Sequence, residues 1–243
     1  MQHLFRDACA RGDLQQVKQM HDEGAVDIHA CDDAAFRTAC GCGRLEVAKW
    51  LFSQGGVNVY VQNDWAFQYA CANRHLSVAE WLLSLGGVQH DSAFSAFQTA
   101  CEKGHCDVAQ WLYGLGGVDV HACCDLALRW ACCNGRLEIA KWLVGLGGTD
   151  VHAEDDEAFR FACGGHLQLA KWLYRLGGVD IHECEDFGFG VACANSDFET
   201  ARWLVGLDPE WDWPLGNMQD LRVWSAPRDA WMRSVIQRTP VGS

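Results

Sequence analysis

This 243-residue chain has no long apolar run and no proline before residue 209. No stretch approaches the roughly 18 apolar residues that a membrane-spanning helix needs. Its start, Met1 to Phe5, lacks the basic and apolar stretches of a secretory signal. We therefore expect an intracellular protein that is neither secreted nor embedded in a membrane.

Basic residues are also scarce. The chain has 19 Lys and Arg against 32 Asp and Glu, which gives a formal net charge of -13. Because phosphates would repel such a chain, this balance argues against general binding to nucleic acid or to anionic membranes. It favours a basic protein partner over an acidic one.

Catalytic motifs are missing too. The sequence has no phosphate-binding loop, nucleophile elbow or His-Glu-x-x-His, and the segment 182–186 (HECED) lacks the second histidine. An enzyme needs a feature unique to one place, whereas nearly everything here repeats. We expect no catalysis and no cofactor.

Self-similarity is the strongest signal present. An Ala-Cys pair recurs every 30 or 31 residues, with its cysteine at Cys9, Cys40, Cys71, Cys101, Cys132, Cys163 and Cys193. A Trp-Leu pair and then a double glycine follow in most copies. Such a period indicates one supersecondary unit copied along a solenoid. The seven cysteines are then too far apart for disulfides, because equivalent atoms of stacked helices lie about 10 Å apart. We interpret them as small buried residues.

Each copy has the pattern of two short helices. In residues 33–56, the first apolar face at helical spacing ends at Cys40, Gly43 interrupts it, and a second stripe begins at Leu45. Asp33, like the aspartates in the same position of other copies, is a candidate N-cap. Helices of about ten residues are unstable alone, so the copies must stack on one another. The recurring tryptophans are predicted to lie in the core, filling space beside small residues of the adjacent copy.

Residues 35–51 (AFRTACGCGRLEVAKWL) resemble the ankyrin repeat, and are most similar to the divergent repeats of giant DNA viruses and some protists. The usual Thr-Pro-Leu-His is absent, and the period is 31 rather than about 33. The resemblance implies an all-α, right-handed-type helix-turn-helix solenoid with short hairpin loops and little or no β structure. It also implies a cytoplasmic protein, in the host cytoplasm if the source is viral.

The resemblance covers about residues 1–207. It divides them into seven repeats at about 1–26, 27–57, 58–88, 89–118, 119–149, 150–179 and 180–207. All four prolines follow, so we interpret 208–243 as a C-terminal capping segment with one helix. The alternative for this segment is a docking tail, such as the tail of a ubiquitin-ligase adaptor.

Histidines recur after an Asp-Val or Asp-Ile pair at His29, His121, His152 and His182. A hydrogen bond that stabilises the turn is the preferred interpretation, and a pH-sensitive edge is the alternative. His-Ala-Cys and His-Glu-Cys triplets suggest zinc, but they lie in separate hairpins and no C-x-x-C pair exists. We therefore predict no metal site.

Acidic residues gather between the repeats, where no Lys or Arg interrupts them. The densest groups supply the candidate docking residues Glu154, Asp155, Asp156, Glu183 and Glu185. A solvated edge is one interpretation of these groups, and a docking edge for a Lys/Arg-rich partner is the other. Calcium is disfavoured, because the regular ligand spacing of a calcium loop is missing.

Ankyrin proteins usually bind through the hairpin tips and the inner face of the first helices. The resemblance places five further candidates there, at Asn73, Glu102, Lys103, Asn134 and Asn195. Three more candidates, Tyr69, Trp130 and Phe161, come just before the Ala of the Ala-Cys pair. We interpret them as half-buried packing residues, and the alternative is that they are exposed binding anchors. The function that follows is a non-catalytic scaffold, expected to be a monomer, that binds another protein through this groove and the acidic edge. A structural spacer without a specific partner is the alternative.

Overall fold

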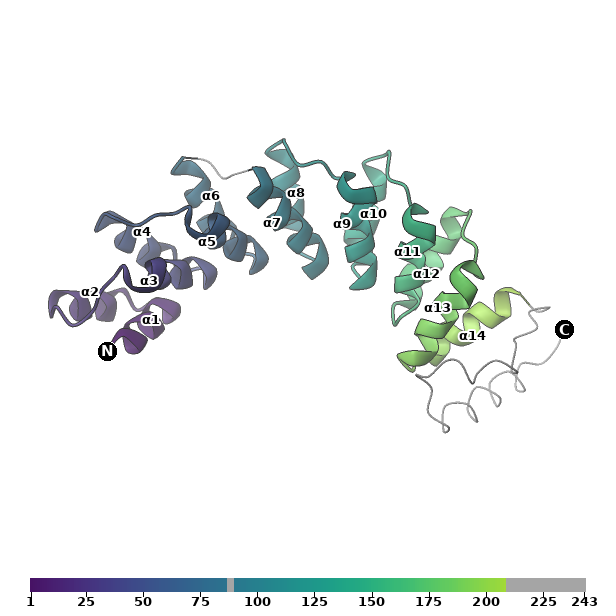
Figure 1. Cartoon of the computed structure of the whole chain (residues 1–243), viewed down its shortest axis with the longest axis horizontal. Coiled ribbons are helices and arrows are strands. Elements are labelled where there is room, and N and C mark those ends of the chain that lie inside the picture. The colour runs from purple at the N-terminus through teal and green to yellow at the C-terminus, as the bar shows by residue number, and fades with distance from the viewer. Residues whose placement is uncertain (87–89, 209–243) are drawn as a thin grey trace. The chain divides into compact units, whose positions relative to one another are not determined.

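The computed structural model describes residues 1–86 and 90–208, and this part of the chain consists of fourteen α-helices without a β-strand (Figure 1). The all-α prediction is confirmed. The helices are α1 (Gln2–Arg11), α2 (Leu14–Asp22), α3 (Ala30–Gly41), α4 (Leu45–Ser53), α5 (Val61–Ala72), α6 (Leu76–Ser84), α7 (His90–Lys103), α8 (Cys106–Gly114), α9 (Ala122–Cys133), α10 (Leu137–Gly145), α11 (Ala153–Ala162), α12 (Leu167–Leu176), α13 (Glu183–Ala194) and α14 (Phe198–Leu207). The capping segment proposed for 208–243 lies, from residue 209 on, outside the described residues.

The helices come in pairs, each with a first helix of odd number and a second helix of even number; we number the pairs as repeats 1 to 7. The chain divides into two compact units, Met1–Ala122 and Cys123–Ser243. In unit 1, each first helix packs on its own second helix and on the next first helix, from α1 through α7. In unit 2, α11 packs on α12 and α13, and α13 on α14. No helix in the described part is long and apolar enough to cross a lipid bilayer.

The Ala-Cys pair lies where first helices meet. Its seven cysteines are at most 1% exposed, and all fourteen cysteines of the chain are free thiols. Burial raises the pKa of the Cys9 and Cys71 thiols to about 12. Small side chains allow this close approach of neighbouring helices, so the predicted role of these cysteines as buried small residues is confirmed.

The recurring tryptophans were predicted to be core residues, and the structure corrects this. Each is only half-buried, and several lie against aromatic rings of the preceding repeat. Trp81 packs on Phe36 and Phe52, with ring centroids 6.2 and 5.8 Å away. Trp203 packs in the same way on Phe159 and Tyr174, at 6.3 and 5.7 Å. The indoles of Trp81 and Trp203 therefore lie at the border between two repeats rather than in the interior.

The predicted N-caps are also wrong. Asp33 does not precede a right-handed helix with its carboxylate on the first-turn amides. Instead Cys31, Asp32 and Asp33 all have left-handed backbones, with φ of 57, 55 and 56°. The Asp33 amide donates to the His29 carbonyl at 3.2 Å, which closes one left-handed turn. The same turn recurs in repeats 5 and 6, at residues 123–125 and 154–156.

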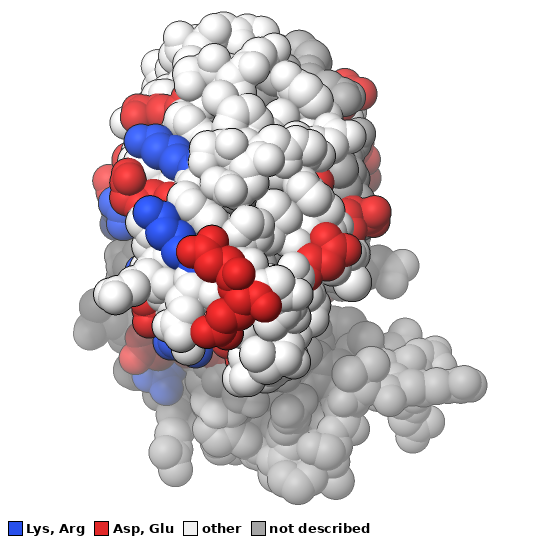
Figure 2. All heavy atoms as spheres, turned by 90° about the vertical axis from the view of Figure 1, so that its left-hand side faces the viewer, with Lys and Arg blue, Asp and Glu red and all other residues white. Residues whose placement is uncertain are grey.

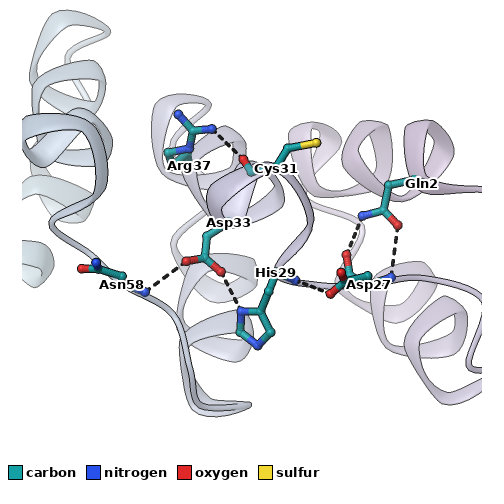
Figure 3. Close-up of polar contacts among 7 residues, drawn as sticks. All are labelled: Gln2, Asp27, His29, Cys31, Asp33, Arg37 and Asn58. Carbon is teal, nitrogen blue, oxygen red and sulfur yellow. Dashed lines mark hydrogen bonds and ion pairs between the residues drawn. The ribbon is translucent and has the colours of Figure 1, made fainter.

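Such a turn costs roughly 1 to 2 kcal/mol per non-glycine residue, so other contacts must hold it. Figure 3 shows them in repeat 2. The buried Asp33 carboxylate bonds the imidazole of His29 at 2.7 Å and accepts from the Asn58 amide of repeat 3 at 3.1 Å. The Arg37 guanidinium donates to the Cys31 carbonyl at 2.9 Å. The preferred interpretation of the histidine, a turn-stabilising hydrogen bond, is confirmed here.

The aspartate links each repeat to the next one in unit 2 as well. Asp125 and Asp156 accept from the amides of Asp150 and Asp180, at 2.8 and 3.2 Å. Repeat 4 has Phe94 in this position instead, and no described residue of α7 has a positive φ. The left-handed turn therefore accompanies the aspartate that stabilises it.

Candidate protein-binding face

In each unit, a row of side chains runs across the first helices and connects consecutive repeats. The row is made of pairs. One member is an Arg or Gln three positions before the buried cysteine of its repeat, such as Arg37 before Cys40. The other lies six positions before the buried cysteine of the next repeat, such as Trp65 before Cys71. In unit 1, Arg37 lies over the Trp65 ring at 5.1 Å, and Ser95 donates to Gln68 at 3.3 Å. In unit 2, Arg129 pairs with Glu157, and Arg160 lies over the Phe187 ring at 5.3 Å. We call the surface formed by this row and its neighbours the first-helix face.

In unit 1 the first-helix face carries Tyr69, which is 44% exposed and stacks on Trp65 with ring centroids 3.7 Å apart. Asn73 is exposed but donates to the Gly41 carbonyl of the preceding repeat at 2.8 Å. Glu102 is half-buried and Lys103 is exposed. Tyr69 and Lys103 are therefore open to a partner, whereas Asn73 also completes the end of α3.

Unit 2 holds a pocket of about 260 Å³ between α9 and α11. Its lining residues are Leu126, Arg129, Trp130, Cys133, Glu157 and Phe161. Trp130 is 43% exposed and Phe161 is half-buried, so the structure brings together two candidate residues that lie 31 positions apart. A pocket with an exposed indole at its border can receive a partner side chain.

The two candidate asparagines of unit 2 have structural tasks. Asn134 is half-buried and donates to the Trp130 carbonyl at 2.9 Å. Asn195 is exposed and donates to the Gly164 carbonyl at 2.6 Å, as Asn73 does for Gly41. Asn195 thus gives a partner to a carbonyl just beyond the end of α11, whereas the Trp130 carbonyl also accepts from the Asn134 backbone amide at 3.2 Å.

The acidic candidates divide into different environments. Glu154 and Asp155 are exposed on the left-handed turn of α11, and Glu183 is half-buried. Asp156 is only 6% exposed, and its two oxygens bond His152 and the Asp180 amide. It therefore does not belong to the docking edge in which the sequence placed it. The side chain of Glu185 lies outside the part that the structure describes.

Two electrostatic effects stand out on these turns. The Glu154 carboxylate on the turn of α11 raises the pKa of the exposed Cys124 thiol on the turn of α9. His182 bonds Asp186 through Nδ1 at 2.6 Å and Asp208 through Nε2 at 3.2 Å. Both carboxylates raise the pKa of His182, and Asp186 contributes most. Figure 2 shows the face at the left-hand side of Figure 1, where acidic and basic side chains lie side by side along one edge of a broad uncharged area.

Sequence reasoning missed several residues of the first-helix face. Trp65, Arg129, Glu157 and Phe187 vary from repeat to repeat, and no single copy marks their position as special. The signal that could have found them is their spacing from the buried cysteine, read across adjacent repeats. Within residues 1–86 and 90–208, no three His, Cys, Asp or Glu side chains are grouped so as to hold a metal ion.

Comparisons with known proteins agree on one kind of repeat. A family model described as ankyrin repeats in three copies matches residues 5–93, and one for ankyrin repeats in many copies matches 97–144. Among solved structures, the chain is similar to the crystal structure of the human ASB11 ankyrin repeat domain, with a TM-score of 0.57 and 20% identity. This alignment covers 76% of the present chain and 95% of the other. At that identity it shows a shared fold. The search of curated proteins found no match.

Proposed function

Because this chain belongs to the ankyrin repeat family, we propose that it is a non-catalytic scaffold that binds another protein through its first-helix face. Members of the family are generally protein–protein interaction modules. The observation that carries the proposal is the pocket between α9 and α11, where Trp130 and Phe161 meet. Partly exposed aromatic anchors beside a pocket are the residues that dominate binding energy at protein interfaces.

The acidic turn of repeat 6 supplies the second part of the proposed interface. Glu154 and Asp155 are exposed beside the pocket-lining helix α11, and the whole chain has a net charge of -13. Carboxylates at the rim of an interface speed association with a basic partner. We propose a monomeric, intracellular protein that uses the pocket for affinity and the acidic turn for orientation.

Affinity capture with variants of the whole chain tests this function. The test variant is Trp130→Ala with Phe161→Ala, and the control is Lys141→Ala, an exposed residue on the second helix α10. Proteins captured by the wild type are quantified by mass spectrometry, purified and titrated back. We expect saturable binding of a captured protein that the pocket variant weakens by at least about tenfold and the control leaves unchanged. A spacer would capture nothing saturable, and that result would overturn the proposal.

A further inference from the structure

The pocket in unit 2 is lined in part by α11, a helix that begins with an acidic turn. Leu126, Trp130 and Phe161 make its lining largely apolar. Asp155 lies six positions before Phe161 on the same helix, on the exposed part of the left-handed turn. Residues 157–161 follow the left-handed turn as helix and rise about 1.5 Å each, so the turn lies roughly 10 Å from the aromatic ring. One extended segment of a partner could therefore reach both the pocket and the acidic turn.

The basic side chains near the pocket are already engaged. Arg129 pairs with Glu157 and also donates to the carbonyls of Cys123 and Cys124 at 2.8 and 3.0 Å. Arg160 donates to the Glu154 carbonyl at 2.8 Å and lies over the Phe187 ring, toward repeat 7. These two guanidinium groups are thus directed at backbone carbonyls, at Glu157 and at an aromatic ring. Arg160 keeps its positive charge beside the turn and offsets part of the charge of Glu154 and Asp155, so the turn stays negative, while Arg129 and Glu157 balance each other at the pocket.

From this arrangement we infer that the pocket receives a short linear segment of a partner protein with a large apolar side chain and a nearby Lys or Arg. The apolar side chain enters between Trp130 and Phe161. The basic side chain lies two to four residues away in the partner, because an extended chain spans roughly 3.3 Å per residue. It is placed over Glu154 and Asp155. The inference rests on the proposed function and adds the chemistry of the partner.

A peptide selection on the whole chain tests the inference without knowledge of the partner. Random linear peptides displayed on phage are selected against the immobilised protein, and the best is synthesised with a fluorescent label. Its Kd is then measured by anisotropy for Trp130→Ala and for Glu154→Gln with Asp155→Asn. Each variant has a matched control in unit 1. Tyr113→Ala removes a side chain of the second helix α8 that is 40% exposed, against 43% for Trp130. Tyr69→Ala is measured as a third variant, which detects peptides that bind in unit 1. Asp32→Asn changes the corresponding exposed turn residue of repeat 2.

We expect selected peptides to share an aromatic or large aliphatic residue and a Lys or Arg two to four positions away. Trp130→Ala should raise Kd at least about tenfold. The double carboxylate variant should raise it about three- to tenfold and reduce its salt dependence, and both controls should stay within about twofold. A motif without basic residues, a Kd unchanged by either test variant, or no specific peptide at all would overturn the inference. Peptides that depend on Tyr69 instead would also overturn it, yet would leave the proposed function standing.

Discussion

The imidazole of His152 lies 2.6 Å from the carboxylate of Asp156, across one turn of left-handed backbone. The second oxygen of the same carboxylate accepts from the Asp180 amide of the next repeat at 3.2 Å. One buried side chain therefore holds an unfavourable turn and also ties two repeats together. The same arrangement joins His29, Asp33 and Asn58 in unit 1 (Figure 3).

Replacing this aspartate should destabilise the protein far more than replacing its neighbour. Asp156→Ala removes both hydrogen bonds and leaves the strained turn unsupported, so we expect a loss of about 2 to 3 kcal/mol in the free energy of unfolding. Asp155→Ala, at an exposed position of the same turn, should change it by less than about 0.5 kcal/mol. Urea denaturation followed by circular dichroism measures both. Equal midpoints for the two variants would refute the assigned role of Asp156.

Thiol reactivity should separate the cysteines by their position in the repeat. The seven cysteines of the Ala-Cys pairs are buried, and burial raises the pKa values of their thiols. Since the thiolate is the reactive form, these seven should react with an aromatic disulfide reagent only after unfolding. Five cysteines are exposed and should react in the folded protein, namely Cys31, Cys123, Cys124, Cys133 and Cys184. Fast modification of Cys40 or Cys132, seen by peptide mapping, would contradict this packing.

The two kinds of tryptophan should respond differently to truncation. Trp81→Ala removes contacts with Phe36 and Phe52, so we expect a loss of about 2 to 3 kcal/mol. This is less than a fully buried ring would contribute, because Trp81 is half-buried. Trp130→Ala, on the exposed first-helix face, should lose less than about 1 kcal/mol. Thermal melts of the two variants give the comparison, and a larger loss for Trp130 would reverse their roles.

Near neutral pH, the contact between His182 and Asp208 should weaken as the pH rises. Asp186 and Asp208 raise the folded-state pKa of His182 above its ordinary value of 6.5. The stabilisation from this contact is therefore fully present below the unfolded pKa and is lost as the pH rises through the folded one. Asp208→Asn should lower the His182 pKa in an NMR titration of the imidazole. An identical His182 titration in wild type and variant would show that Asp208 does not act on it.

The repeat period and the buried face were predictable because the same apolar positions recur in every copy. Every Ala-Cys pair, including Cys40 and Cys132, lies in the core as its spacing indicated. The left-handed turn was not predictable, because an aspartate before a helix has the same sequence pattern whether it caps that helix or bonds the next repeat. Asp33 therefore looked like an N-cap, and Asp156 looked like part of an exposed edge.

The candidate site was predictable only in part. Trp130 and Phe161 were candidates for either packing or binding, and their place in one pocket depends on how α9 and α11 pack. Arg129 and Glu157 lie 28 positions apart in the sequence, and their pairing joins two repeats. No pattern within one copy contains such a pair. The sequence thus identifies the positions that vary, and the packing decides which of them come together.

Site-specific photocrosslinking in cells tests the central claim, binding through the first-helix face, most directly. A photoreactive phenylalanine analogue replaces either Trp130 on α9 or Tyr113 on the second helix α8, two side chains that are 43% and 40% exposed. We expect a discrete crosslinked protein from position 130 and none from position 113. Equal crosslinking at both positions, or a product from position 113 alone, would contradict the claim.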